Sequence, residues 1–209
     1  MMLQNSKLKA EGWKMLMAEF GFAENLDTHS KLITAYNEPH RKYHTLEHIN
    51  ACFEHLSSVD LQADHAHEIE LALWFHDAVY KILSSTNEAD SAQLACSFLI
   101  ENNAHAECIE RIGDLILITK DHAAPKTKDA KLMLDIDLSI LGSAPAIYAQ
   151  FEKNVREEYR HVPGFIFRPK RKKILRSFLE RPTIYYSAYF SERLEAQARE
   201  NLNKAINTL

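Results

Sequence analysis

The stretch LALWFHDAVY, residues 71–80, follows the apolar spacing of a helix but carries a histidine and an aspartate. His76 stands three residues after Leu73 and so continues the apolar stripe, while Asp77 follows Leu73 by one full turn. An imidazole and a carboxylate are thus turned towards the protein interior. The pattern predicts a helix over 68–80, whose apolar stripe consists of Ile69, Ala72, Leu73 and Tyr80.

Similar helical spacing recurs on both sides of this stretch. Only five glycines and six prolines occur in 209 residues, too few for the many turns of an all-β fold. No linker or repeat divides the chain, so we predict one all-α domain over residues 1–209, a helical bundle with additional C-terminal helices. The further helices are expected before Gly21, over 28–39, 45–56, 85–101, 105–119, 131–141 and 144–161, and after Pro169 and Tyr189.

Composition and charge limit the partners and the cellular compartment. The formal net charge is −4, which does not favour nucleic acid as a partner. The three cysteines form no CxxC pair, the N-terminus lacks the apolar run of a signal peptide, and no apolar stretch is long enough to span a membrane. We therefore expect a cytoplasmic protein with no membrane partner, and a homodimer is compatible with the sequence.

Two further stretches carry polar side chains on predicted helix faces. In RKYHTLEHIN, residues 41–50, His44 and His48 stand four apart, so their rings point to one side. In KLMLDIDLSILG, residues 131–142, Asp137 falls on an apolar stripe, where an apolar residue is expected. Each stretch therefore adds an imidazole or a carboxylate to the interior.

Burying such groups is costly unless a charge or a metal compensates them. Taken singly, each residue is explained as well by a satisfied core histidine, a helix cap or an ion pair. Three predicted helices, however, direct such groups inward, and one divalent cation would satisfy them together. Mixed nitrogen and oxygen ligands suit zinc or a first-row transition metal. The sequence therefore predicts a metal site.

The order His48, then His76 and Asp77, then Asp137 resembles the H…HD…D signature of the HD-domain superfamily of metal-dependent phosphohydrolases. The C-terminal helices are similar to those of a subfamily of small predicted HD hydrolases. The resemblance implies an HD-type helical fold with a metal-binding core over about 41–142, in which those four residues hold one divalent metal. Mn, Mg, Fe, Co, Ni and Zn all stay open, as does a second metal.

The segment YHTLEHI, residues 43–49, also resembles the YHNxxH segment of the cyclic-nucleotide phosphodiesterases. In that comparison His48 matches a metal ligand, and His44 matches the proton donor to the leaving group. Thr45 replaces the asparagine of the pattern, so cyclic-nucleotide specificity is not implied.

These residues lead to a hypothesis of phosphoester hydrolysis, with a small phosphorylated metabolite or nucleotide as substrate. A metal-activated water would attack phosphorus, and Asp77 would orient that water. His44 would protonate the departing oxygen; alternatively, it only hydrogen-bonds a ligand carboxylate. Two other functions stay open: an iron-dependent oxygenase of the same fold, and a metal-containing binding or sensing module without turnover.

Three residues are candidates for binding the substrate phosphate. Arg41 could bind it through two N–H groups, or be a surface arginine. Lys120 and His122, in ITKDH, could contact phosphate, and His122 could instead be a second-metal ligand or a solvated loop residue. The basic run RPKRKKILR, residues 168–176, is interpreted as the solvated face of a helix that packs Ile174, Leu175, Phe178 and Leu179 inward.

Overall fold

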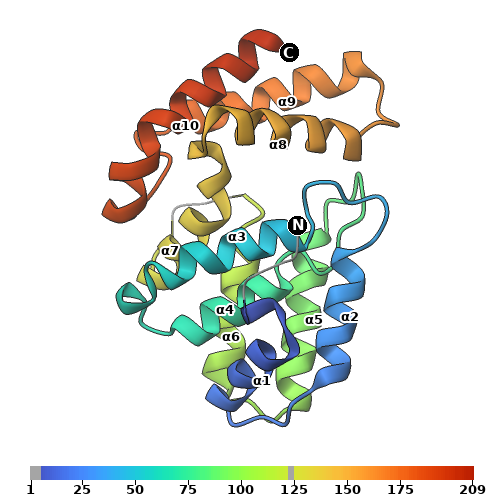
Figure 1. Ribbon diagram of the computed structural model, residues 1–209, viewed down its shortest axis with the longest axis vertical. Coiled ribbons are helices and arrows are strands. Elements are labelled where there is room, and N and C mark those ends of the chain that lie inside the picture. Colours follow the sequence, from blue (N-terminus) through green and yellow to red (C-terminus); the bar gives the residue numbers. More distant parts are fainter. Residues whose placement is uncertain (1–5, 122–124) are drawn as a thin grey trace. The chain divides into compact units, whose positions relative to one another are not determined.

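The computed structural model describes residues 6–121 and 125–209 of the chain. These residues form ten α-helices and three short 3-10 helices, and they contain no strand (Figure 1). The all-α prediction is therefore confirmed.

The packing divides the chain into two compact units, residues 1–134 and 135–209. We predicted one domain because no linker divides the chain, and none marks this division, since the boundary falls inside a helix, α7 (Lys128–Asp137). The first unit contains η1 (Ser6–Leu8), α1 (Ala10–Glu19), α2 (Leu26–Tyr36), α3 (Leu46–Ser57), η2 (Asp60–Gln62), α4 (Ala66–Phe75), α5 (Asn87–Glu101) and α6 (Ala106–Leu117).

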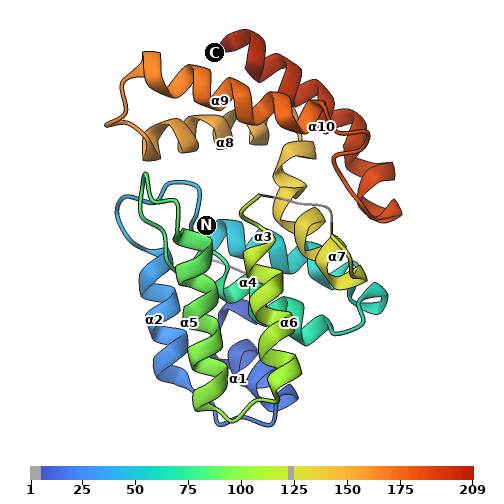
Figure 2. The same cartoon turned by 180° about the vertical axis from the view of Figure 1, so that it is seen from behind.

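Helix α4 is the centre of the first unit. It contacts α1, α3, α5 and α6, and α5 and α6 lie side by side (Figure 2). All its residues from Glu68 to Phe75 are buried. Trp74 meets the edge of Trp13 at 5.6 Å between ring centroids, and the buried carboxylate of Glu68 accepts two hydrogen bonds from Arg111 of α6. The helix is apolar on nearly every side because it is packed on every side.

The helix predicted over 68–80 ends five residues earlier, at Phe75. The backbone N–H of Ala78 bonds to the Phe75 carbonyl at 2.9 Å, which closes a turn. The carbonyls of Asp77 and Ala78 then accept hydrogen bonds from the Arg41 side chain. Tyr80 lies in a non-helical segment, but its side chain is buried in the core. The apolar spacing therefore continues beyond the end of the helix.

The second unit consists of η3 (Leu138–Gly142), α8 (Pro145–Glu158), α9 (Gly164–Leu179) and α10 (Ala188–Thr208). Helices α8, α9 and α10 lie side by side in both views (Figures 1 and 2). Helix α10 contacts η3, α8 and α9. Its Asn201 donates hydrogen bonds to the carbonyls of Leu141 and Ser143, at 2.9 and 2.8 Å. A buried amide thus fixes α10 against the end of η3.

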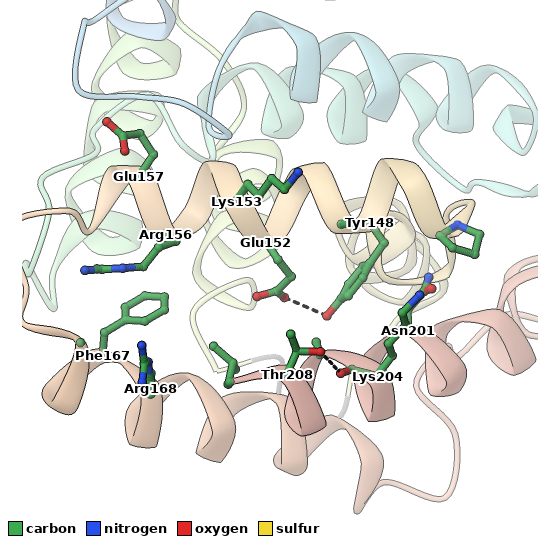
Figure 3. A pocket seen from close by; sticks show the side chains of 15 residues that line it. Tyr148, Glu152, Lys153, Arg156, Glu157, Phe167, Arg168, Asn201, Lys204 and Thr208 are labelled. Carbon is green, nitrogen blue, oxygen red and sulfur yellow. Dashed lines mark hydrogen bonds between the residues drawn. The ribbon is translucent and has the colours of Figure 1, made fainter.

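A pocket of about 690 Å³ lies between α8, α9 and α10 (Figure 3). Arg171 of α9 binds Glu152 of α8 through two hydrogen bonds, and Tyr148 donates a third to the same carboxylate. The guanidinium of Arg156 lies over the Phe167 ring, 4.8 Å from its centroid. These contacts turn one face of α9 towards α8, so the other face of α9 is exposed to solvent.

The basic helix begins before the predicted position. Helix α9 starts at Gly164 and runs through Pro169. A proline has no N–H for the carbonyl four residues earlier, here Phe165. Phe165 is 78% exposed, so water can reach this end of the helix. The prediction that Ile174 packs inward is wrong: its side chain is exposed, whereas Leu175 and Phe178 are buried.

No single helix within 6–121 or 125–209 has both the length and the apolar character needed to cross a membrane. One bent pair of segments, 128–142 and 145–158, meets that requirement of length and composition when the two are taken together.

Gly142 is required for close packing within the second unit. A Cβ atom at this position would lie 2.5 Å from Leu194 Cβ and 2.8 Å from the Leu194 carbonyl oxygen of α10. Gly142→Ala should therefore lower the free energy of unfolding by about 1–3 kcal/mol, measured from urea unfolding curves. At Gly164 the nearest atom to an added Cβ is 3.8 Å away, so Gly164→Ala is the matched control. Equal unfolding midpoints for the two variants would contradict this assignment.

Candidate metal centre

Two turns of the first unit bring imidazole and carboxylate groups together. His76 and Asp77 follow the last residue of α4, and His48 is the third residue of α3. Thr45 caps α3, since its hydroxyl oxygen accepts a hydrogen bond from the Glu47 N–H at 3.3 Å. The cap fixes the start of α3, and His48 lies within its first turn. His48 and His76 are buried, and Asp77 is partly buried.

The three ligand atoms lie at the corners of a small triangle. The Nε2 atoms of His48 and His76 are 3.2 Å apart. Asp77 Oδ2 is 3.2 Å from His76 Nε2 and 3.8 Å from His48 Nε2. A point equidistant from these atoms in their plane lies about 2.0 Å from each, which matches the distances of nitrogen and oxygen ligands from zinc. This group of two histidines and an aspartate could therefore hold a metal ion.

A hydrogen bond made by Nδ1 of His76 leaves its Nε2 available to bind a metal. His76 Nδ1 lies 2.9 Å from the Leu73 carbonyl oxygen. A carbonyl can only accept, so Nδ1 carries the hydrogen and, in the neutral ring, Nε2 keeps its lone pair. Bonds of this kind also fix the orientation of metal-binding imidazoles.

His48 has a similar partner that helical spacing alone did not identify. The Tyr43 hydroxyl lies 3.1 Å from His48 Nδ1, and the Cys52 sulfur lies 3.8 Å from both ring nitrogens. Tyr43 precedes α3, so its position relative to His48 depends on the loop rather than on helical periodicity. Its only sequence signal is its place in the YHTLEHI segment.

The electrostatics of the group favour an ionised aspartate. Burial raises the pKa of Asp77, but the neighbouring imidazoles of His76, His44 and His48 outweigh this effect and hold that pKa well below its usual range. A carboxylate that stays ionised at neutral pH is the form that binds a metal.

His44 lies at the edge of the same group. It occupies the turn before α3, where its ring stacks on Tyr80 with 4.2 Å between centroids. The His44 and His48 rings are 6.4 Å apart. His44 is partly exposed, so it can reach both solvent and the neighbourhood of Asp77. This position is compatible with both roles predicted for it.

Arg41 is buried, not a surface arginine, and its side chain supports the turn that carries Asp77. It donates hydrogen bonds to the carbonyls of Asp77, Ala78 and His44, and to the Glu38 carboxylate. The rings of Tyr36 and Tyr80 lie 5.2 and 5.4 Å from the guanidinium carbon. Four of its five N–H groups are thus used by the chain, and its side chain has no exposed surface.

The remaining predicted residues come from other elements of the chain or are not described. Asp137 is the last residue of α7 and belongs to the second unit. Lys120 is exposed in the turn after α6. His122 lies outside the described residues.

Asp135, two residues before Asp137, is used within the second unit. It is fully buried and accepts hydrogen bonds from the backbone N–H groups of Tyr186 and Ser187, at 2.8 and 2.7 Å. These residues immediately precede α10. Burial raises the pKa of Asp135, although its hydrogen bonds partly offset the effect. Its structural role distinguishes it from Asp137.

Comparisons with protein-family models, curated proteins and solved structures found no match for this chain. The case for the site therefore rests on its residues and their geometry.

Removing the Arg41 side chain should release the turn that carries Asp77. Arg41→Ala would remove the Arg41 donors from three carbonyls and open a cavity between two tyrosines. We expect the free energy of unfolding to fall by at least about 2 kcal/mol, measured by urea unfolding. Arg160→Ala, which removes an exposed ion pair with Glu157, is the control and should cost less than about 1 kcal/mol. Similar losses in both variants would contradict the role given to Arg41.

Proposed function

We propose that the chain is a metal-dependent phosphohydrolase that acts on a small phosphorylated metabolite or nucleotide. The observation that carries the proposal is the triangle of His48 Nε2, His76 Nε2 and Asp77 Oδ2, whose size fits one divalent ion. The same ordered residues resemble the signature of the HD superfamily of metal-dependent phosphohydrolases, which supports this activity.

We further propose Asp137 as the fourth ligand. Helix α7 is continuous from Lys128 to Asp137, so Asp137 lies one turn beyond the buried Met133 on the same helix face. In this proposal its carboxylate would join His48 and His76 in holding the ion. Two imidazoles and two carboxylates suit zinc, manganese, iron, cobalt or nickel, and magnesium stays open.

In this proposal a divalent ion would supply positive charge that acidifies water and neutralises phosphoryl oxygens. Asp77, ionised beside three imidazoles, accepts a hydrogen bond from the attacking water and so orients it. His44, partly exposed and stacked on Tyr80, donates a proton to the departing oxygen. Lys120 and His122 remain the candidates for binding the phosphate, because the chain itself occupies most of the Arg41 donors.

Metal removal and reconstitution test the proposal. Chelator-treated protein should hydrolyse neither p-nitrophenyl phosphate nor nucleotides, and one of Mn²⁺, Mg²⁺, Co²⁺, Ni²⁺, Fe²⁺ or Zn²⁺ should restore turnover. Elemental analysis should show near-stoichiometric metal in the wild type, and less than a tenth of that in His76→Ala and Asp77→Ala. His105→Ala, at an exposed histidine that precedes α6, is the control and should keep both metal and turnover.

Each failure has a distinct meaning. Metal in the wild type without hydrolysis of any phosphoester would overturn the hydrolase proposal and favour a metal-containing binding module. No metal after reconstitution would overturn the metal site itself. Full metal content in Asp137→Ala would remove only the fourth ligand from the proposal.

The role of His44 can be separated from metal binding. If His44 is the proton donor, His44→Gln should lower kcat by about 10²–10⁴-fold while the metal content stays at the wild-type level. The measurement is kcat on p-nitrophenyl phosphate alongside elemental analysis of the same sample. A parallel loss of metal and activity would instead give His44 a supporting role beside a ligand.

A further inference from the structure

Helix α9 carries a dense positive surface. Six lysines and arginines occur among residues 164–179, and no aspartate or glutamate does. Arg171 is paired with Glu152 of α8. Arg168 lines the pocket between α8, α9 and α10 (Figure 3). The other four form what we call the basic face of α9, and none of them has a carboxylate partner among the described residues: Lys170, Lys172, Lys173 and Arg176.

The overall net charge of −4 conceals this surface. Residues 135–209 contain 13 lysines and arginines and nine aspartates and glutamates, so the second unit is positive. Residues 1–134 contain 12 lysines and arginines and 20 aspartates and glutamates, so the first unit is strongly negative. Such an asymmetry between parts of a chain is typical of proteins that bind an anionic surface through one part.

Apolar side chains stand among these cations and are exposed as well. Phe165 is 78% exposed and Ile166 39%. Ile174 is 47% exposed as well, but it follows Phe165 by nine residues, about two and a half turns, and so lies on the opposite side of the helix. The inner face of the helix is already packed, since Phe167, Leu175 and Phe178 are buried. The exposed apolar side chains are therefore not needed to pack α9 within its unit. Their contact with water is unfavourable.

We propose that the basic face of α9, with Phe165 and Ile166, binds the surface of an anionic membrane. Cations on this face meet lipid phosphates, while Phe165 and Ile166 enter the boundary between head groups and acyl chains. A nucleic acid would satisfy the cations and stack on Phe165, but would leave Ile166 in water. The bilayer is thus the surface that matches both sets of exposed side chains.

This proposal revises the expectation of no membrane partner. That expectation came from the absence of a long apolar stretch. Such a stretch is needed to span a bilayer but not to bind its surface. The exposure of Ile166 could not be obtained from the sequence, because helical spacing also allows it to pack inward.

Vesicle binding by the full chain tests the proposal. The protein should co-sediment with vesicles that contain phosphatidylglycerol, but not with vesicles of phosphatidylcholine alone, and added salt should weaken binding. Each lysine near an anionic surface strengthens binding about fivefold, so the double variant Lys172→Gln and Lys173→Gln should bind about 25-fold more weakly. Phe165→Ser should also weaken binding, by at least about fivefold.

Matched controls separate this surface from overall charge. Lys126→Gln with Lys131→Gln makes the same change of charge at two exposed positions elsewhere. Leu61→Ser removes an apolar side chain that is 97% exposed outside α9. Both controls should bind as the wild type does, and unchanged urea midpoints should show that all variants are folded.

Three results would overturn the proposal. The first is no binding to phosphatidylglycerol vesicles, and the second is an equal loss in the control variants. The third is binding of single-stranded RNA or DNA that requires Lys172 and Lys173, with vesicle binding unaffected by Phe165→Ser; the partner would then be a nucleic acid.

Discussion

Two imidazole nitrogens and a carboxylate oxygen meet where α4 ends, between 3.2 and 3.8 Å from one another. This arrangement removes His48 and His76 from water and brings their Nε2 atoms close to Asp77 Oδ2. The Leu73 carbonyl and the Tyr43 hydroxyl bond to the far nitrogens of the two rings. Both Nε2 atoms are therefore directed at the same point, and a cation there would compensate the buried carboxylate.

The surrounding chain is organised around that turn. Helix α4 is buried along most of its length, so its end is rigidly placed, and Arg41 binds the carbonyls that follow it. Burial and the nearby Asp77 charge raise the pKa of Tyr36 well above its usual range, so its hydroxyl stays a donor to the Trp74 carbonyl. Side chains that never touch a ligand atom thus fix the direction of Asp77 and His76.

The sequence predicted the candidate ligands more readily than their supports. His76 and Asp77 interrupt an apolar stripe, and His48 stands four residues after His44, so both patterns can be recognised from helical spacing. Arg41 and Tyr43 lie in the loop before α3, where no periodicity relates them to the end of α4. The end of α4 at Phe75 could not be predicted from apolar spacing either. Tyr80 is buried although it lies in a non-helical segment, so the apolar pattern continues past the helix. No linker marks the division inside α7, although the balance of charged residues differs between the two units.

Anomalous X-ray diffraction from crystals of the reconstituted protein tests the central claim most directly. Data collected at the absorption edge of the added metal should give one strong peak, about 2 Å from His48 Nε2, His76 Nε2 and Asp77 Oδ2. A peak at another place, or none while the two Nε2 atoms stay hydrogen-bonded to each other, would contradict the account. The histidines and the aspartate would then be a buried polar network without a metal.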